Sequence, residues 1–386
     1  MTKKISIFGA TGSIGTSTLD LVEQEPGRFE VVALTANRDV QGLAAAARRT
    51  GARIAVIGEE ALLGDLRAAL AGSGIEAAAG AGALVDAARA GADWTMAAIV
   101  GCAGLPPVMA AIEAGGVVAL ANKEALVSAG ALMTAAAART GARILPVDSE
   151  HNAIWQCFDH DRPDRIARIL LTASGGPFRS RSRAEMASVT PEEAVRHPNW
   201  SMGAKISVDS ATMMNKGLEL IEAARLFPVP HERIEILVHP QSVIHSMVEY
   251  VDGSVLAQLG TPDMRTPIAY TLAWPDRMTT RAERLDLVRH GRLEFEAPDE
   301  DRFPALRLAR AAVIACGARP AILNAANEVA VAAFLGRRIG FLDIAAIVEE
   351  TLGRYDPPAP RSIDDVFSID QDARRQAEAA MKVFVD

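Results

Sequence analysis

Two carboxylates in the middle of the sequence are the first candidates for chemistry. Asp148 and Glu150 stand two residues apart after the apolar run 144–147, which predicts a strand. If that strand continues through them, both side chains point to one side, because successive side chains alternate between the faces of a strand. Two carboxylates held together repel each other unless a cation separates them, and hard oxygen ligands favour Mg²⁺ or Mn²⁺. The alternative is a helix cap beside a solvated charge.

A second group of polar side chains follows in the stretch 205–219. Asn215, Lys216 and Glu219 stand at positions i, i+1 and i+4, so Lys216 and Glu219 share one face if the stretch is helical. The hydroxyl, amide and ammonium donors of this stretch suit a phosphate, and Glu219 supplies a further carboxylate for a metal. An ordinary surface ion pair would have the same spacing.

Two stretches between these groups could close around a ligand. Ser174 opens a Ser-Gly-Gly turn after the predicted strand 166–172, and the exposed amides of such a turn can bind an anion. A plain loop is the alternative. The polar stretch 197–203 carries Trp200, and an exposed tryptophan there indicates a lid over a site, whereas a buried core tryptophan is the other interpretation.

The beginning of the chain carries a glycine pattern. Gly9, Gly12 and Gly15 follow the predicted strand 5–8 and precede a predicted helix. In this context glycines permit a tight turn, and the helix N-terminus presents N–H groups and a partial positive charge to a pyrophosphate. The spacing is G-x-x-G-x-x-G, not the commoner G-x-G-x-x-G. The pattern predicts a nicotinamide dinucleotide site, with a glycine-rich turn that binds nothing as the alternative.

The residues after the second predicted strand distinguish NAD from NADP. The chain reads Asn37-Arg38-Asp39 where an acidic residue would bond the ribose of NAD. Arg38 suits the 2′-phosphate of NADP, which favours NADP. Asp39 could instead bond a ribose hydroxyl or cap the helix that begins near residue 40.

Alternating β-branched runs and alanine-rich stretches must position the residues of the first domain, 1–147. That rhythm predicts βαβ units and a Rossmann-like parallel sheet, which binds ligands at the carboxyl ends of its strands. The predicted strands are 5–8, 31–34, 54–57, 97–100, 117–120 and 144–147, and the predicted helices are 17–24, 40–49, 60–69, 83–90 and 123–139.

The pattern changes after residue 147. We expect a central α+β domain over 148–278, with a strand at 166–172, a hairpin of 243–250 and 254–259, and a lid at 180–205. A polar linker over 279–298 leads to a C-terminal α-helical domain over 299–386, where apolar residues recur at helical spacing. The predicted helices of that domain are 303–316, 322–335, 342–352 and 370–383. The fold class is therefore α/β.

Composition excludes several classes of function. The chain of 386 residues has a formal net charge of −8 and no basic block, which argues against nucleic acid because binding it requires clustered Lys and Arg. Cys102, Cys157 and Cys316 are far apart and suit neither a disulfide framework nor a zinc site, so we expect a cytoplasmic protein. The most apolar window, 96–121, contains two prolines and Glu113 and predicts no membrane span.

Eight stretches, in their order along the chain, together resemble the 1-deoxy-D-xylulose 5-phosphate reductoisomerase family of the non-mevalonate isoprenoid pathway. They are GATGSIG at 9–15, ALANKE at 119–124, PVDSEH at 146–151, LTASGGPF at 171–178, HPNWSMG at 197–203, KISVDSATMMNKGLE at 205–219, HPQSVIHSMVEY at 239–250 and GTPDMR at 260–265. The resemblance covers essentially the whole chain. The sequence departs from the family pattern at 37–39, where the family commonly has Gly, then Lys or Arg, then Asn.

The resemblance implies the role of each candidate residue. The implied cofactor-binding residues are Thr11, Gly12, Ser13, Ile14, Asn37, Arg38, Asp39, Asn122, Glu124 and Gly203. The implied catalytic and substrate-binding residues are Lys123, Ser149, Glu150, Ser174, His197, Trp200, Ser210, Asn215, Lys216 and Glu219. The implied ligands of a Mg²⁺, Mn²⁺ or Co²⁺ ion are Asp148, Glu150 and Glu219.

The resemblance also implies an activity. A metal-assisted rearrangement of a phosphorylated ketose would give a branched aldehyde, which NADPH would reduce to 2-C-methyl-D-erythritol 4-phosphate. The family further implies a homodimer whose central domain carries catalysis and dimerisation. A plain NADP-dependent dehydrogenase of a phosphorylated substrate would explain the glycine pattern, but not three acids beside phosphate donors. A non-catalytic NADP-binding regulatory protein would be expected to have lost an acid or Lys216, and all are present.

Overall fold

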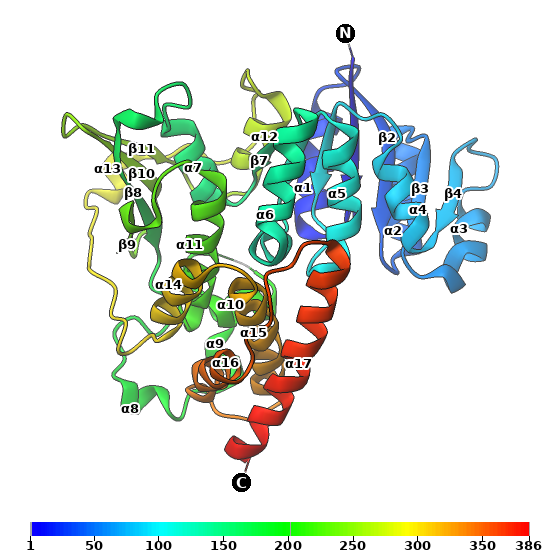
Figure 1. Ribbon diagram of the computed structural model, residues 1–386. Helices are drawn as coiled ribbons and strands as arrows, with labels where there is room; N and C mark the ends of the chain where they lie inside the picture. The colour runs from blue at the N-terminus through cyan, green and yellow to red at the C-terminus, as the bar shows by residue number, and fades with distance from the viewer. Residues whose placement is uncertain (1, 201, 386) are drawn as a thin grey trace. The chain divides into compact units, whose positions relative to one another are not determined.

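The structure divides the chain into two compact units, which are described one at a time. It is a computed structural model that describes residues 2–200 and 202–385, with side chains to 382. Unit 1 comprises Met1–Ala125, Ala131–Asn152 and Asp263–Glu283, and unit 2 comprises Leu126–Gly130, Ala153–Pro262 and Arg284–Asp386 (Figure 1). The four-segment division into 1–147, 148–278, 279–298 and 299–386 stays a prediction.

Unit 1 is built on a seven-stranded parallel sheet, as the alternating pattern predicts. The strand order is β4-β3-β2-β1-β5-β6-β7. The strands are β1 (Lys3–Phe8), β2 (Phe29–Ala36), β3 (Ile54–Ile57), β4 (Glu76–Ala79), β5 (Trp94–Ala97), β6 (Val117–Leu120) and β7 (Arg143–Pro146). The chain builds outward from β1 to β4, then returns and continues from β5 on the other side of β1. The order therefore reverses between β1 and β5, where open α/β sheets bind their ligands.

The helices of unit 1 begin and end at identifiable residues. They are α1 (Ser13–Gln24), α2 (Val40–Thr50), α3 (Leu63–Ala69), α4 (Gly80–Ala88), α5 (Leu105–Ala114), α6 (Lys123–Thr140), α7 (Ser149–Cys157) and α12 (Arg265–Ala273), of which α6 and α7 also contribute residues to unit 2. Helix α2 begins where the Asp39 side chain accepts a hydrogen bond from Gly42 N, and it ends at Gly51, whose φ of 63° suits glycine.

Three predictions for unit 1 are wrong or incomplete. The strand predicted at 97–100 lies at Trp94–Ala97, because Trp94 and Met96 are the buried residues that pair with β1 and the chain then turns toward Gly101. Strand β4 and helix α5 are absent from the prediction. β4 is a short edge strand made mostly of alanine, so it lacks the β-branched side chains that indicate a strand.

Helix α12 returns to unit 1 from far along the sequence. Ile268, Ala269 and Leu272 are buried in the same apolar cluster as Ile5 and Trp94. Residues 263–278 therefore pack with the dinucleotide-type sheet, although the sequence pattern places them in the central domain.

Unit 2 contains a four-stranded mixed sheet of order β11-β10-β8-β9. Its strands are β8 (Ile166–Ala173), β9 (Ile234–Val238), β10 (Ile244–Tyr250) and β11 (Val255–Leu259). The predicted hairpin is confirmed, since β10 and β11 pair antiparallel and Gly253 N donates to Tyr250 O. Strand β9, which the prediction lacks, pairs parallel with β8.

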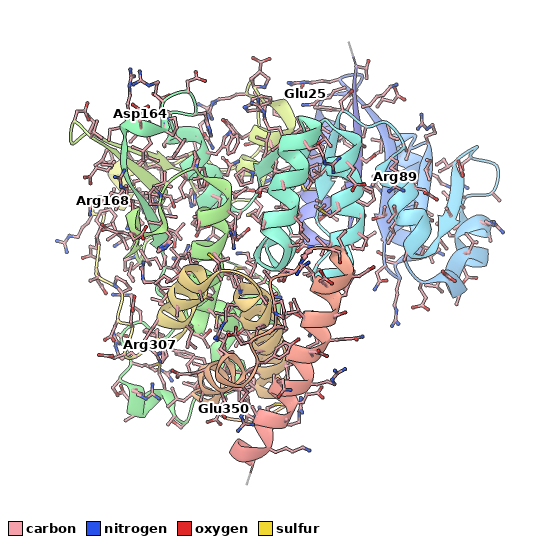
Figure 2. All side chains as sticks on the ribbon, in the orientation of Figure 1. Glu25, Arg89, Asp164, Arg168, Arg307 and Glu350 are labelled. Carbon is pink, nitrogen blue, oxygen red and sulfur yellow. The ribbon has the colours of Figure 1, made fainter. Side chains whose placement is uncertain are left out.

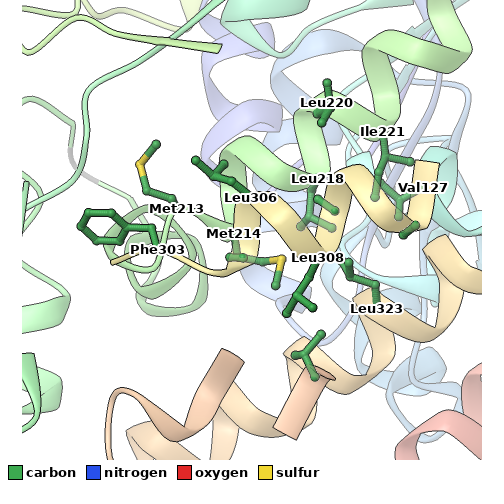
Figure 3. Packing of buried hydrophobic residues seen from close by; sticks show 14 of the residues in the cluster. Val127, Met213, Met214, Leu218, Leu220, Ile221, Phe303, Leu306, Leu308 and Leu323 are labelled. Atoms are coloured by element: carbon green, nitrogen blue, oxygen red, sulfur yellow. The ribbon is translucent and has the colours of Figure 1, made fainter. Parts of the chain in front are cut away.

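The helices of unit 2 enclose a large apolar core. They include α8 (Arg183–Met186), α9 (Pro191–Ala194), α10 (Ala204–Ala211), α11 (Met214–Leu226), α13 (Leu287–His290), α14 (Ala305–Ala315), α15 (Arg319–Leu335), α16 (Asp343–Arg354) and α17 (Ile363–Val385). Figure 3 shows Leu218 of α11 beside Leu306 and Leu308 of α14. The C-terminal helical bundle is confirmed, and it packs against the helix that carries Asn215, Lys216 and Glu219.

Many charged side chains are exposed, as are Arg89, Asp164 and Glu350, which are labelled in Figure 2. Arg168 of β8, for example, bonds to Glu235 at 2.7 Å and to Glu249 at 2.7 Å across neighbouring strands of its sheet. Among the described residues, no helix combines the length and the apolar character that crossing a bilayer requires.

Candidate active site

The glycine turn of unit 1 has the geometry of a phosphate-binding turn. Gly9 has a φ of +85°, and a Cβ there would lie 2.6 Å from Ala98 O. A Cβ on Gly15 would lie 2.2 Å from Gly9 O, so close packing of helix on turn requires glycine at both positions. A Cβ on Gly12 would meet nothing closer than Gly9 O at 3.4 Å. The protein's own packing therefore does not explain Gly12, whereas the approach of a ligand to the backbone would.

The turn presents the N-terminus of α1 at the β1 and β5 edge. Gly12 precedes the helix, and no side chain caps its N–H groups among the described residues. Thr35 at the end of β2 fixes the turn, because its side-chain oxygen accepts from Gly9 N at 3.0 Å and its carbonyl accepts from Ala10 N at 2.7 Å. Thr11, Gly12, Ser13 and Ile14 thus surround a helix terminus suited to an anion. Thr35 is a positioning residue that the sequence pattern does not reveal.

The three residues at 37–39 make different contacts in the structure. The Asp39 side chain caps α2 through Gly42 N at 2.9 Å, which is the capping role that the sequence left open. The Arg38 guanidinium lies 3.2 Å from Glu59, and its side chain is 76% exposed. It is therefore accessible to an anionic group. Asn37 lies beside Gly58, because a Cβ added to that glycine would lie 2.8 Å from Asn37 Oδ1.

Helix α6 begins at the Asn-Lys-Glu stretch. Asn122 is 2% exposed and caps the helix through Ala125 N at 2.9 Å. Its amide nitrogen donates to Ile99 O at 2.6 Å and Gly101 O at 2.9 Å. Asn122 thus joins the start of α6 to the loop after β5, at the ligand-binding edge of the sheet. Lys123 and Glu124 follow in the first turn, and Glu124 is buried.

The acidic pair after β7 lies at the start of a helix and not on a strand. β7 ends at Pro146 and α7 begins at Ser149, so the prediction that the strand continues through the pair is wrong. The two carboxylates nevertheless lie together, with oxygen atoms within 4.8 Å of each other. Asp148 instead precedes the helix, and its Oδ1 accepts from Glu150 N at 3.2 Å. The Ser149 hydroxyl donates to Glu150 at 2.6 Å.

Asp148 is held by two cationic or polar neighbours. Lys123 Nζ lies 3.0 Å from its Oδ2, and His151 Nδ1 lies 3.0 Å from its Oδ1. His151 is fully buried. The sequence pattern gives His151 no role, although its spacing of three from Asp148 becomes informative once the stretch is known to be helical. Its contact orients Asp148 in the way that outer groups orient metal-binding carboxylates.

In unit 2 the Ser-Gly-Gly turn lies against the end of α10. Gly175 and Gly176 have positive φ values of 82° and 68°, and a Cβ on Gly176 would lie 2.6 Å from Ser210 O. Ser174 Oγ accepts from Gly176 N at 3.2 Å. Ser174 and Ser210, which are separated in sequence, are therefore brought together by the close approach that glycine permits.

His197 connects this turn to the lid stretch. Its Nδ1 accepts from Asn199 N at 3.2 Å and Trp200 N at 2.9 Å, and its Nε2 lies 3.0 Å from Ser174 Oγ. In the neutral ring the two accepted bonds place the proton on Nε2, which then donates to Ser174. Asn199 Nδ2 ties the same stretch to Pro240 O at 2.8 Å.

Trp200 is partly exposed, so it is neither a core residue nor fully open to solvent. Its ring centroid lies 6.2 Å from that of His245. Gly203 stands before α10, and a Cβ there would meet nothing within 4 Å. As at Gly12, packing within the described residues does not require glycine.

The first turn of α11 carries the remaining donors. Met213 adopts a φ of 62° before the helix, and Asn215 and Lys216 follow. Both donate to Glu219 one turn later, and Lys216 and Glu219 are 4% and 1% exposed. The predicted shared face is confirmed, but the pair is buried and is not the surface ion pair of the alternative interpretation. Burial of such a pair requires strong compensating bonds, which suits a binding site.

Three family models together match most of the chain. A family model described as 1-deoxy-D-xylulose 5-phosphate reductoisomerase matches residues 5–130. A model of the C-terminal domain of 1-deoxy-D-xylulose 5-phosphate reductoisomerase matches residues 144–227, and a model described as the DXP reductoisomerase C-terminal domain matches 259–376.

Individual relatives are similar over more than nine-tenths of their length. The 1-deoxy-D-xylulose 5-phosphate reductoisomerase of Zymomonas mobilis is 65% identical over 380 residues, covering 98% of each chain. That of Rhodospirillum centenum is 60% identical over 375 residues, covering 97% of this chain and 93% of the relative.

Solved structures agree with the fold. The structure of the Zymomonas mobilis reductoisomerase in complex with NADPH matches with a TM-score of 0.96 at 63% identity, covering 99% of this chain and 100% of that one. A crystal structure of DOX-P reductoisomerase with NADPH, fosmidomycin and magnesium matches with a TM-score of 0.93 at 44% identity, covering 99% and 98%.

Proposed function

Since the chain belongs to the 1-deoxy-D-xylulose 5-phosphate reductoisomerase family, we propose that it converts 1-deoxy-D-xylulose 5-phosphate into 2-C-methyl-D-erythritol 4-phosphate. It is an NADPH-dependent oxidoreductase that uses a divalent cation, in the formation of isoprenoid precursors. The observation that carries this assignment is the combination of a dinucleotide turn with a buried phosphate-donor cluster ending in Glu219.

The residues of unit 1 fit NADPH. The backbone at Gly12 is unobstructed, and the N-terminus of α1 offers N–H groups to the pyrophosphate. Arg38 is the exposed guanidinium that would contact the 2′-phosphate, and Asp39 supports it indirectly by fixing the start of α2. Asn37, Asn122 and Glu124 of unit 1, and Gly203 of unit 2, are assigned to the cofactor on the family pattern.

The acids fit a hard divalent cation. Asp148, Glu150 and Glu219 supply carboxylate oxygens, the ligand type that Mg²⁺ and Mn²⁺ prefer. Lys123 and His151 orient Asp148, while Asn215 and Lys216 orient Glu219. Ser149 is placed to orient Glu150 and to contact the substrate.

The phosphate of the substrate is assigned to Ser174, Ser210, Asn215 and Lys216. Ser174 accepts from His197 and from Gly176 N, so its own hydroxyl hydrogen can be donated to a phosphate oxygen. Lys216 supplies a charge-assisted donor from a buried position. Holding the phosphate firmly lets binding energy far from the reacting carbons orient the substrate.

The reaction then depends on positioning and on exclusion of water. When bound, the cation polarises the ketone and the neighbouring hydroxyl, and NADPH supplies the hydride for the final reduction. Lys123 would contact the substrate near the reacting carbons. His197 holds the stretch that carries Trp200, whose ring would cover the site and protect the aldehyde from water.

Two further properties are proposed. The chain acts as a homodimer, and the exposed Val255 and Leu256 on the edge strand β11 are consistent with a covered surface. It works in the cytoplasm, where the thiols of Cys102, Cys157 and Cys316 would stay reduced.

The assignment is tested with the purified protein, NADPH, Mn²⁺ and 1-deoxy-D-xylulose 5-phosphate. We expect NADPH oxidation that chelation abolishes, with a branched product by NMR. An unbranched polyol would instead identify a plain dehydrogenase. Glu219→Gln should weaken Mn²⁺ activation by about tenfold or more while NADPH affinity is retained. Glu232→Gln, on an exposed acid of the same unit, is the control.

A further inference from the structure

Helix α10 contains a buried carboxylate directly before Ser210. Asp209 is 1% exposed, although an isolated carboxylate is strongly disfavoured in such a position. It is a member of neither the proposed metal set nor the proposed phosphate set. Its burial therefore requires partners, and their positions indicate what it does.

The two oxygens of Asp209 bond to different parts of unit 2. Oδ2 lies 2.9 Å from Nζ of Lys205, one turn earlier in the same helix. Oδ1 accepts from Nδ2 of Asn327 at 2.8 Å, and Asn327 lies 118 residues later in α15. Asp209 thus links the helix that carries Ser210 to the C-terminal bundle.

Helix α15 is a firm support for this link. Asn327 is fully buried, and the helix packs in the apolar core through Ile322, Leu323 and Val331. One turn from Asn327, the polar side of α15 continues with Asn324, which donates to Glu328 at 3.2 Å. Arg374 of α17 bonds to Glu328 and to Asp370, so α15 is also tied to the last helix.

The side chain of Asn327 has one buried polar atom that lowers the stability of the fold. Its amide donor is used on Asp209, and its buried oxygen Oδ1 has no hydrogen-bond partner among the described residues. A buried amide oxygen without a partner lowers stability, and an apolar side chain of similar size would avoid it. An asparagine at this position is explained by its hydrogen bond to Asp209, which an apolar side chain could not form.

The end of α10 is where small displacements would matter. The Gly176 turn lies against Ser210 O, and Thr212 Oγ1 accepts from Met214 N at 3.3 Å at the start of α11. A shift of α10 would therefore alter the spacing between Ser174, Ser210 and Asn215. The ammonium of Lys205 balances the charge of Asp209, so that a phosphate near Ser210 does not face an uncompensated anion.

We propose that Asp209 and Asn327 form a positioning pair that sets the phosphate subsite from the C-terminal bundle without contacting the substrate. The inference rests on the proposed function, because that function assigns Ser174, Ser210 and Asn215 to the phosphate. On this proposal, substrate affinity also depends on α15, a helix that contributes no residue to the proposed site itself.

The test compares Asn327→Leu with Asn324→Leu. Both replace a fully buried asparagine of α15, but only Asn327 contacts Asp209. Asn327→Leu should raise the KM for 1-deoxy-D-xylulose 5-phosphate and the inhibition constant of inorganic phosphate by about tenfold, the loss expected for a hydrogen bond to a charged group. The KM for NADPH should stay within about twofold, and kcat should change less than the substrate KM.

The exchange Asp209→Asn with Asn327→Asp separates positioning from general stability. It keeps one amide and one carboxylate in contact but removes the ion pair between Lys205 and Asp209, so it should recover part of the lost phosphate affinity. Equal effects of Asn327→Leu and Asn324→Leu, or an equal change in the NADPH and substrate KM values, would overturn the proposal. If Asn327→Leu does not fold, Asn327→Ser gives the same comparison with a smaller polar side chain. Absence of wild-type turnover would instead reject the proposed function.

Discussion

The ammonium of Lys123 lies 3.0 Å from Oδ2 of Asp148. Their side chains are 15% and 14% exposed, so solvent screens the pair only in part. The proposed function assigns Lys123 to the substrate and Asp148 to the cation. Because the ammonium repels the cation that the carboxylate attracts, substitution of the two residues should change Mn²⁺ affinity in opposite directions.

We expect Lys123→Met to lower kcat/KM by about a hundredfold, since a substrate contact is lost where charge develops. Mn²⁺ should bind the variant at least as tightly, because a positive charge near the site is removed. Asp148→Asn should weaken Mn²⁺ binding by about tenfold. Steady-state kinetics and Mn²⁺ titration measure both. Weaker Mn²⁺ binding in Lys123→Met would be contrary to the proposed arrangement.

Gly15 and Gly12 are expected to fail in different ways when changed to alanine. A Cβ on Gly15 would collide with backbone atoms at 2.2 and 2.5 Å, so Gly15→Ala should lower the free energy of unfolding by about 1–3 kcal/mol. Gly12→Ala meets nothing closer than 3.4 Å and should leave stability nearly unchanged while it weakens NADPH binding. Urea denaturation and NADPH fluorescence titration distinguish them, and equal destabilisation would contradict the assignment of Gly12 to the cofactor.

Arg38 should determine the preference for NADPH over NADH. Arg38→Ala should reduce the ratio of kcat/KM values for the two cofactors by about tenfold, because a charge-assisted bond to the 2′-phosphate is lost. Glu59→Gln is the matched variant, since Glu59 pairs with Arg38 at 3.2 Å and its neutralisation should increase the preference slightly. An unchanged ratio in Arg38→Ala would assign the 2′-phosphate to other residues.

Asp263 and Arg265 should make part of the stability depend on pH. Burial would raise the pKa of Asp263, but hydrogen bonds from Arg265, two of them at 3.0 and 2.6 Å, lower it overall. A carboxyl whose pKa is lower in the folded state stabilises the fold above its unfolded pKa, near 4, and loses this contribution as the pH falls through the folded pKa.

The destabilisation caused by Asp263→Asn should therefore be largest above about pH 5 and decline toward about pH 3, within the window set by linkage. Denaturant midpoints measured across that range provide the test. Asp164→Asn, at an exposed pair with Arg162, should show a smaller effect because solvent screens it. A destabilisation by Asp263→Asn that grows as the pH falls would contradict the lowered pKa of Asp263 in the folded state.

Local patterns in the sequence were sufficient for several elements. Gly9, Gly12 and Gly15 between an apolar run and a helix predicted the turn at the end of β1, because tight turns depend on nearby residues alone. The spacing of Lys216 and Glu219 predicted a shared face on α11 for the same reason. The periodicity of the last hundred residues likewise predicted the helical bundle.

Features that depend on distant contacts were beyond these patterns. The apolar run 144–147 predicted a strand that would continue through Asp148 and Glu150. The structure instead begins helix α7 at Ser149, and this helix brings His151 into contact with Asp148. Strand β9 was missed because its pairing with β8 joins segments more than sixty residues apart.

The sequence by itself therefore determined the family, the cofactor turn and the residue types available for chemistry, since these depend on side-chain identity and short spacing. Only the tertiary structure decided which side chains support them. Thr35 reaches Gly9, Gly176 lies against Ser210, and Asn327 bonds to Asp209 across 118 residues. Such contacts form only when whole helices and sheets pack together, because packing brings polar groups from distant segments into the same buried region, where they must bond to each other.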